Sequence, residues 1–328
     1  MTAGGGGRVA DVGGGGPLDR PAAAIPAGRP PAGPARVLLT GATGRVGARF
    51  LPLLRAAGAE LRLAVWSPAG RPGPANPALV TGDLIDPDVC RRAVAGMDAV
   101  VHLASAFVGV TAGQAEALNY RATRALAAAA LAAGVRQFVQ LSSYLVYRPA
   151  AGRPAREGDR LRAPDGPPFA AAKLGSERAV AELAGTGLAV CVLRLAFTYG
   201  EGDPHLAEAV GWARSAPAGR RLHLVHHADV RQAVLRCLRA GTRGTFNIAD
   251  DAPVPPAELL AVTADLPPRL REPARAEAGR NGPAGGPGEL AGGPGELAGE
   301  VDTTAARTGL GFAPGYPSIR TARQAGAI

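Results

Sequence analysis

The chain has 328 residues, 47% of them hydrophobic, which is enough for one large α/β domain or for a core with a smaller appendage. Its net charge of +9 comes from dispersed arginines without aromatic interleaving, which argues against a nucleic-acid-binding protein. No apolar run reaches the ~18 residues of a membrane span and the Gly/Pro-rich start has no signal-peptide core, so we expect a cytoplasmic protein without a membrane partner.

The predicted elements alternate between strands and helices. Residues 1–35 are rich in Gly, Pro and Ala and lack apolar periodicity, which predicts a flexible tail. Strands are predicted at 37–39, 61–66, 78–81, 99–104, 137–141 and 188–195. Helices are predicted at 49–57, 87–96, 115–133 and 167–183. This alternation predicts an α/β fold, a doubly wound parallel Rossmann sheet over residues 36–198, with ligands at the carboxyl ends of the strands.

The last part of the chain is less regular. Residues 199–328 are punctuated by Gly and Pro, which predicts a smaller, partly irregular substrate-binding or lid region. Within it, a helical pattern followed by a strand pattern indicates that residues 228–248 return to the core. Residues 273–300 hold the unit Gly-Gly-Pro-Gly-Glu-Leu-Ala twice in succession. Two copies are too few for a solenoid, so we expect a mobile surface loop.

The strongest motif follows the first strand. The sequence Thr-Gly-Ala-Thr-Gly-Arg-Val-Gly at residues 40–47 lies between an apolar run and an amphipathic helical segment. In this context the first glycine allows a tight turn, the second lets the backbone approach a pyrophosphate, and the third lets helix and strand pack closely. The N–H groups of the first helical turn then bind phosphate. The predicted dinucleotide contacts are Gly41, Thr43, Gly44, Arg45, Val46 and Gly47.

The second strand favours NADP(H), with NAD(H) as the alternative. An NAD site has an Asp or Glu about 20 residues after the glycine turn, where it binds the ribose hydroxyls. Here that position falls at Trp66 and Ser67, and the next carboxylate after them is Asp83. Arg45 in the turn and Arg71 in the following loop are suited to a 2′-phosphate, with Ser67 as a further donor. A solvated surface charge is the competing interpretation of either arginine.

Further motifs follow in an order that one family shares. They are Gly82-Asp83, His102-Leu-Ala-Ser105, Asn119, Ser142-Ser143 with Tyr147, Lys173, Arg194, Tyr199-Gly200 and Asp229-Val230. Over about residues 36–250 the chain resembles an extended short-chain dehydrogenase/reductase of the nucleotide-sugar epimerase/dehydratase type. The resemblance implies that Asp83 and Leu84 flank the adenine and that Ala104 lies along the dinucleotide, whereas a simple turn residue is the alternative for Asp83.

The same resemblance exposes a missing residue. In that family a Tyr transfers the proton at the carbonyl or alcohol oxygen, a Lys holds the nicotinamide ribose, and a Ser orients the substrate oxygen. Ser143 matches the serine, and Lys173, the only lysine among the 36 Lys and Arg residues, matches the lysine. One helical turn before Lys173, where the tyrosine is expected, the chain has Phe169. The expected site therefore lacks its usual acid.

Three explanations for Phe169 stay open. One is a protein that binds nucleotide without catalysis, although the retained Lys173 argues against it. Another is a displaced donor, namely Tyr144, Tyr147, Ser143 or a water molecule. The third is a substrate that supplies its own proton, as an aromatic polyketide ketone does when a neighbouring phenol is hydrogen-bonded to its carbonyl. Losing a positioned acid costs roughly 10²–10⁴ in rate, so an internal donor would be a substantial replacement.

The substrate prediction follows from the third explanation. A tyrosine-free reductase of this kind resembles the angucyclinone ketoreductases of antibiotic biosynthesis. Aromatic side chains that border the cleft in this fold suit a flat polycyclic ligand, although core packing explains them equally well. The predicted substrate contacts are Ser105, Phe107, Ser143, Tyr144, Phe169, Phe197 and Tyr199, with Trp212 as a further aromatic candidate.

No metal site is predicted. Cys90, Cys191 and Cys237 are far apart in the sequence and include no Cys-x-x-Cys pair, so neither a disulfide framework nor a zinc site is indicated. His226 and His227 are adjacent but lack a third ligand, so we expect them to cap or pack the helix that follows.

The sequence as a whole predicts an NAD(P)H-dependent ketoreductase, in which Ser143 orients the ketone and Lys173 holds the ribose. We expect His102 to be a core histidine, and Asn119 and Arg194 to fix the backbone. The alternatives are a non-catalytic dinucleotide sensor and a nucleotide-sugar epimerase or reductase, which would need the tyrosine. The expected partner is a small aromatic polyketide, and because the resembling family often dimerises, a homodimer is a further expectation.

Overall fold

The computed structural model describes the chain with a few gaps, and both the predicted tail at residues 1–35 and most of the predicted loop, residues 273–298, lie outside the described residues. The described residues are 36–66, 78–107, 109–148, 152–162, 166–203, 205–272 and 299–328. The strands within them are β1 (Arg36–Thr40), β2 (Glu60–Val65), β3 (Ala78–Thr81), β4 (Ala99–His102), β5 (Gln137–Ser143), β6 (Ala189–Leu195), β7 (Phe197–Tyr199), β8 (Leu224–His226) and β9 (Gly244–Ile248).

The main sheet has seven parallel strands in the order β3-β2-β1-β4-β5-β6-β9, and β7 and β8 form a separate parallel pair. β1 pairs with β2 on one side and with β4 on the other, so successive strands wind outward in both directions from this point. In such a sheet the crevice that takes a ligand opens at the carboxyl ends of the two strands where the order reverses. The predicted doubly wound Rossmann sheet is confirmed.

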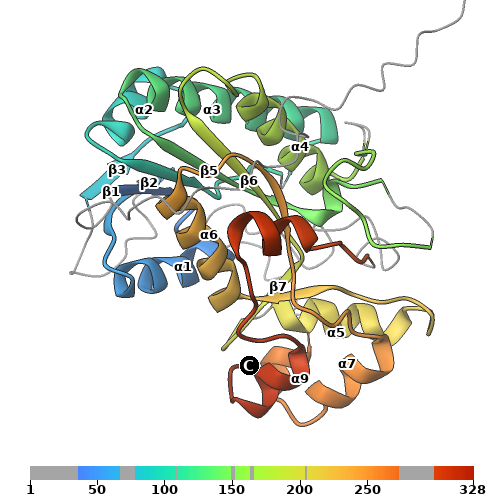
Figure 1. Cartoon of the computed structure of the whole chain (residues 1–328). Coiled ribbons are helices and arrows are strands. Elements are labelled where there is room, and N and C mark those ends of the chain that lie inside the picture. Colours follow the sequence, from blue (N-terminus) through green and yellow to red (C-terminus); the bar gives the residue numbers. More distant parts are fainter. Residues whose placement is uncertain are drawn as a thin grey trace, which may run out of the picture.

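Helices cover both faces of the sheet. They are α1 (Arg45–Ala56), α2 (Pro87–Val94), α3 (Ala112–Ala132), α4 (Pro168–Ala181), α5 (His205–Ser215), α6 (His227–Ala240), α7 (Pro256–Thr263), α8 (Pro268–Arg271) and α9 (Ile319–Gln324), with a 3₁₀ turn η2 (Tyr144–Val146) and a π-helical turn η3 (Ala306–Leu310). Figure 1 shows α2, α3 and α4 on one face and α1 and α6 on the other. None of the helices that the structure describes is long and apolar enough to span a lipid bilayer.

The strands divide their side chains between two cores because successive residues of a strand point to opposite faces. Val37 and Leu39 of β1 belong to the core under α1 and α6, whereas Leu38 belongs to the core under α2, α3 and α4. The central strands β5 and β6 are buried along their whole length. This burial explains why β6 is a nearly continuous apolar run in the sequence, whereas β5 also buries the polar residues Gln137 and Gln140.

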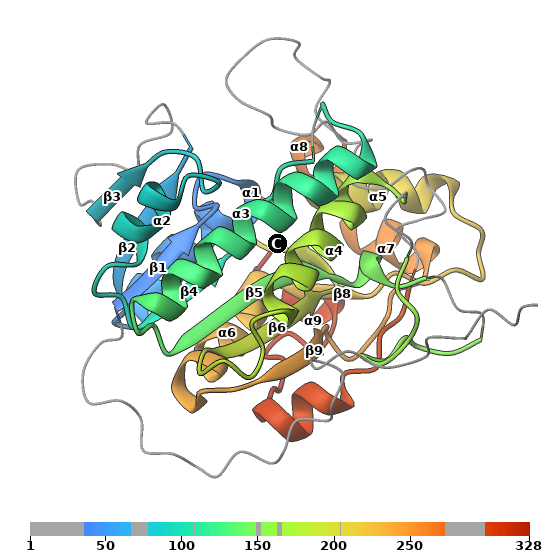
Figure 2. The same ribbon diagram turned by 90° about the horizontal axis from the view of Figure 1, so that it is seen from above.

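The smaller lobe lies beyond the carboxyl ends of the strands, where Figure 1 and Figure 2 place α5 and α7. Its first helix, α5, lies inside the stretch 199–222 for which no helix was predicted. The reason is its burial: eight of its eleven residues are buried, so it has no polar face and no amphipathic pattern. At residues 299–301, Gly299 bridges Leu222 and Val301 bridges Ala155.

Candidate functional site

The glycine turn between β1 and α1 is closed to side chains at two of its three glycines. Gly41 has a φ of +71°, and a Cβ at this position would lie 2.6 Å from the backbone nitrogen of Ala104. A Cβ on Gly47 would lie 2.0 Å from the carbonyl oxygen of Gly41. The first and third glycines therefore let the turn pack against the end of β4 and let α1 pack against the turn.

The same turn leaves the N-terminus of α1 available to an anion. Gly44 is its N-cap and offers no side-chain hydrogen bond, and the first turn contains no acidic residue. Thr43 and Gly44 are exposed, and the first helical hydrogen bond runs from the Ala48 N–H to the Gly44 carbonyl at 2.9 Å. The N–H groups before Ala48, at residues 45–47, thus have no acceptor within the helix. This arrangement fits a dinucleotide phosphate.

The adenosine end of the expected site lies at β2 and β3. Trp66, directly after β2, is 73% exposed, so an aromatic ring stands where an NAD site would carry a carboxylate. Asp83 accepts a hydrogen bond from the Ile85 N–H at 2.9 Å, which makes it a turn residue, and the half-buried Leu84 packs on the core beside α2. Ser67 and Arg71 lie outside the described residues, as does the side chain of Arg45.

A buried polar chain joins the glycine turn to the helices behind it. The Thr40 hydroxyl lies 2.6 Å from His102 Nδ1, and the Thr123 hydroxyl lies 3.0 Å from His102 Nε2. Thr123 donates in turn to Ser176 at 3.1 Å. Burial and the nearby Lys173 ammonium lower the pKa of His102 to about 3. His102 is therefore a neutral core histidine with both nitrogens satisfied, as predicted.

The loop after β4 is held in place by Asn119 of α3. The Asn119 amide donates to the carbonyls of Ala106 and Ala115, both at 2.6 Å, and its oxygen accepts the Ala106 N–H at 3.0 Å. The predicted backbone-fixing role of Asn119 is confirmed. In the same loop, the Ser105 hydroxyl is buried and has no hydrogen-bond partner among the described residues.

Two predicted substrate contacts from distant segments pack against each other. Phe107 meets Phe169 of α4 edge to face, with ring centroids 5.0 Å apart. The Lys173 ammonium lies 5.7 Å from the Phe169 ring centroid and donates to the Leu141 carbonyl at 3.2 Å. Burial lowers the pKa of Lys173 to about 8, although Glu177 opposes this shift. The lysine is thus held in the core with a hydrocarbon ring beside it, where the family pattern would place a phenol.

Ser143 ends β5 on the same sheet edge. It is 7% exposed, and its oxygen accepts the Leu145 N–H at 3.2 Å. This bond fixes the oxygen and leaves the hydroxyl proton able to reach a substrate carbonyl.

The two tyrosines considered as displaced donors lie near Ser143 in sequence. The Tyr147 hydroxyl donates to Asn247 at 2.6 Å and accepts from Arg194 at 3.0 Å, and burial raises the pKa of Tyr147 to about 12. Arg194 also forms a buried ion pair with Glu177 and donates to the Glu157 carbonyl, so it fixes backbone as predicted. Tyr147 is therefore committed to a structural network.

Tyr144 is buried in η2, and its ring packs against Gly299, where an added Cβ would lie 3.0 Å from the ring. Burial raises the pKa of Tyr144, although the nearby Arg162 opposes the shift.

The remaining aromatic candidates belong mainly to the core. Tyr199 is fully buried, with its ring 5.3 Å from that of His226, and Trp212 is 3% exposed. Their contacts match the core-packing alternative. Phe197, which follows β6, meets the ring of His205 edge to face at 6.4 Å between centroids. Of these three residues, Phe197 is the one that contacts the cluster of Asp203, His205 and His227.

Sequence reasoning missed a cluster at the junction of β7, α5 and α6. His226 caps α6 as expected, because its Nδ1 accepts the Ala228 N–H at 3.1 Å. His227 instead reaches the carboxylate of Asp203, which also binds His205 Nδ1 at 2.9 Å. The only sequence signal is the spacing of Asp203 two residues before His205. Asp203 and His227 are 24 residues apart, so no local pattern joins them.

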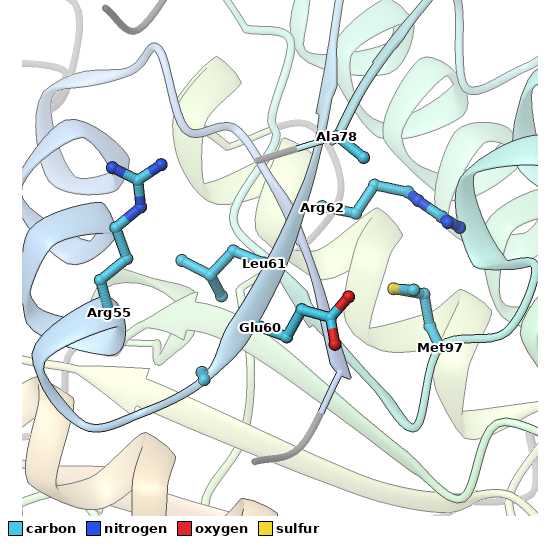
Figure 3. Close-up of a pocket in the computed structure, with 7 residues that line it drawn as sticks. Arg55, Glu60, Leu61, Arg62, Ala78 and Met97 are labelled. Carbon is cyan, nitrogen blue, oxygen red and sulfur yellow. The ribbon is translucent and has the colours of Figure 1, made fainter. Parts of the chain in front are cut away.

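Two further features of the described residues bear on the site. No group of three His, Cys, Asp or Glu residues is arranged to hold a metal ion there. A cavity of about 300 Å³ is lined by residues such as Arg55, Glu60 and Met97. Figure 3 shows it at the start of β2, where Leu61 and Arg62 point to opposite faces of the strand. It therefore lies at the amino end of the strands, away from the glycine turn.

Comparisons with known proteins place the chain among nicotinamide-dependent enzymes. Residues 37–249 match the NAD dependent epimerase/dehydratase family. A 3-diazoavenalumate denitrifying reductase from a Streptomyces species is 31% identical over 312 residues, covering 87% of this chain and 98% of that protein. A 3β-hydroxysteroid dehydrogenase/Δ5→4-isomerase from Mycobacterium tuberculosis is 32% identical over 183 residues, 51% of this chain and 48% of that protein.

A solved structure gives the same result for the fold. A short-chain dehydrogenase/reductase superfamily protein from Agrobacterium tumefaciens with bound NAD aligns with a TM-score of 0.66 and 25% identity, over 88% of this chain and 95% of that one. With the glycine turn, the strand order and the match over residues 37–249, the chain belongs to the NAD-dependent epimerase/dehydratase family of extended short-chain dehydrogenases/reductases.

Proposed function

We propose that the protein is an NAD(P)H-dependent ketoreductase that reduces a carbonyl of an aromatic polyketide of the angucyclinone type, in antibiotic biosynthesis, without a tyrosine acid. The observation that carries the proposal is the corner formed by Phe169 and Lys173. The lysine is retained and buried, whereas the ring beside it has no proton to give. The chain thus keeps the lysine that would hold the cofactor, while it lacks the tyrosine that serves as proton donor in the family pattern.

The chain's own residues would divide the work in the following way. Residues 41–47 would hold the pyrophosphate, and Lys173 would hold the nicotinamide ribose. Reduced nicotinamide supplies a hydride to the carbonyl carbon. Ser143 would orient the carbonyl oxygen by donating its hydroxyl proton in a hydrogen bond. The proton that completes the alcohol would come from a substrate phenol next to the carbonyl, because that hydroxyl is already hydrogen-bonded to the reacting oxygen.

The aromatic side chains at the expected cleft and one of the relatives support a flat polycyclic substrate. Phe107 and Phe169 pack edge to face at the expected cleft, and aromatic faces of this kind suit a fused-ring ligand. One relative, matched over about half of each chain, is a dehydrogenase of a hydroxysteroid, which is itself a fused-ring alcohol. For the cofactor we propose NADPH in preference to NADH, because Trp66 replaces the expected ribose-binding carboxylate.

A second reaction is favoured by one comparison. The relative matched over 98% of its length is named as a denitrifying reductase of a diazo compound. Reductive removal of a diazo group replaces carbon-bound dinitrogen by a hydride and creates no alkoxide. Such a reaction also needs no tyrosine. Both candidate reactions would use the same cofactor site, and neither needs a tyrosine acid. They differ only in the carbon that accepts the hydride, which is a carbonyl carbon in one and the carbon that carries the diazo group in the other.

The test is NADPH oxidation by the purified protein with two ketones. One is a hydroxyanthraquinone whose phenol lies beside a carbonyl, and the other is its methyl ether. We expect turnover of the free phenol and a loss of roughly 10²–10⁴ in rate for the ether, the range for losing a positioned acid. The assay is repeated with NADH and with an aryl diazonium salt. NADPH binding without turnover of any of these substrates would contradict the proposal.

A further inference from the structure

A fully buried carboxylate lies between two imidazoles at the edge of the smaller lobe. One oxygen of Asp203 accepts hydrogen bonds from His205 Nδ1 at 2.9 Å and from the His205 backbone N–H at 3.0 Å. The other oxygen binds His227 Nε2, and the Arg49 guanidinium lies 3.8 Å from the carboxylate. Burial opposes ionisation of Asp203, but the hydrogen bonds from both histidines outweigh it and lower the pKa of Asp203.

The carboxylate fixes which nitrogen of each ring carries a proton. An ionised carboxylate only accepts hydrogen bonds, so His205 Nδ1 and His227 Nε2 are both protonated. The other nitrogen of His227, Nδ1, is buried without a partner among the described residues, so a proton there would be an unpaired charge in the core. The other nitrogen of His205, Nε2, is not among the buried side-chain atoms that lack a hydrogen-bond partner. Of the two rings, His205 is therefore the candidate for contact with a ligand.

The backbone places His205 at the chemical end of the cofactor site. Ser143 pairs with Leu195 in the sheet, and Phe197, two residues later, meets the His205 ring. On the other side, Arg49 from the second turn of α1 donates to the Gly202 carbonyl at 2.8 Å. The segment that carries Asp203 and His205 thus runs between the helix of the phosphate turn and the end of β6.

We propose that His205, oriented by Asp203, is a catalytic residue that contacts the substrate phenol and restores the proton which that phenol gives up. The inference rests on the proposed function and names the partner of the substrate hydroxyl. The carbonyl carbon gains a hydride from the reduced nicotinamide, and the carbonyl π pair becomes a lone pair on oxygen. The phenol O–H bond breaks as its proton moves to that oxygen. The phenolate then takes the proton from His205 Nε2, which leaves a neutral imidazole that solvent reprotonates.

Charged and titratable groups from three elements surround His205. Asp203 and His227 face it within the cluster, Arg49 reaches the cluster from α1, and Glu208 follows one turn later on α5. The imidazolium, with a proton on each ring nitrogen, is the form that can donate to the phenolate. An acid held by a carboxylate in this way contributes roughly 10²–10⁴ in rate.

The experiment compares two variants that both keep a hydrogen-bond donor to the Asp203 carboxylate. His205→Asn keeps an amide N–H in place of Nδ1 and removes Nε2, whereas His227→Gln keeps an amide N–H in place of Nε2. The first readout uses no cofactor: the absorbance of the bound hydroxyanthraquinone reports its ionisation across neutral pH. We expect the wild type and His227→Gln to ionise the bound phenol at the same pH and His205→Asn to require a higher pH. Identical titrations in all three proteins would overturn the proposal.

The second readout is NADPH oxidation with the same ketone. We expect His205→Asn to lose about 10²-fold in rate, and His227→Gln to change the rate by only a few fold. Equal losses in both variants would mean that the cluster only braces the loop, which overturns the proposal. A shifted phenol titration in His205→Asn without turnover by the wild type would keep the His205 contact and reject the ketoreductase.

Discussion

The two ends of the candidate site are built in different ways. At the phosphate end, the turn and its helix come from one continuous stretch, residues 40–47, and the constraints are the two backbone approaches at Gly41 and Gly47. At the chemical end, Ser143, Lys173 and His205 come from β5, α4 and the start of α5. The cofactor-binding end therefore depends on local backbone geometry, whereas the chemical end depends on buried contacts between distant elements.

The largest expected effect tests the cross-element contacts. Glu177→Gln removes the carboxylate that lies 2.7 Å from the Arg194 guanidinium. The guanidinium is then buried and charged without its ion-pair partner. Breaking a buried pair from one side costs about 3–5 kcal/mol, which urea unfolding measures. The control is Glu182→Gln, because the pair of Glu182 with Arg124 is largely exposed and worth up to about 1 kcal/mol. Equal losses in the two variants would contradict this account of the chemical end.

The next prediction concerns Lys173 and pH. Its pKa is about 8 in the fold against an ordinary value of 10.5, so below about pH 8 both states are protonated and the fold carries the cost of a buried charge. Between these values the unfolded chain binds the extra proton, so stability rises with pH by about 3 kcal/mol in total. Lys173→Met should be more stable than the wild type at neutral pH, lack this rise and bind NADPH more weakly.

Urea unfolding of both proteins at neutral and alkaline pH checks the lysine prediction. Parallel stability profiles for the wild type and Lys173→Met would show that the lysine is buried without cost, and would remove the argument that its retention is functional.

Gly47→Ala probes the phosphate end. The added Cβ would lie 2.0 Å from the Gly41 carbonyl, so α1 must move away from the turn. A misplacement of about 1 Å can cost on the order of 10²-fold, and we expect a loss of this size in NADPH affinity by fluorescence titration. Gly113→Ala is the matched control, because nothing lies within 4 Å of a Cβ there. Unchanged NADPH affinity in Gly47→Ala would contradict the assignment of the turn.

The same contrast explains what the sequence predicts. The β1–turn–α1 unit was predictable because its glycine spacing and flanking patterns are contiguous, and β5 was found up to Leu141 because Phe138, Val139 and Leu141 form a short apolar pattern. The structure extends β5 to Ser143 and begins α1 at Arg45, four residues before the predicted start. Such ends depend on hydrogen bonds of the turn, which hydrophobic periodicity does not report.

The smaller lobe was harder to predict for a physical reason. α5 is buried on nearly all sides, so it lacks the polar face that marks a helix. The contact between Asp203 and His227 joins the segment after β7 to the first residue of α6, and the β7–β8 pair brings the two together. Likewise, no sequence pattern indicated that Cys191 and Cys237 have their sulfurs 3.1 Å apart as free thiols in the core. Such contacts arise only from tertiary packing.

The most direct test is the turnover of the hydroxyanthraquinone and its methyl ether by the wild type and Phe169→Tyr, and the free phenol gives the smallest expected difference between the two enzymes. With the free phenol we expect the two enzymes to differ by a few fold, because the substrate already carries its donor. With the ether, the restored tyrosine should recover much of the roughly 10²–10⁴-fold loss seen in the wild type. Equal turnover of phenol and ether by the wild type would contradict a substrate-borne proton and place the acid on the protein.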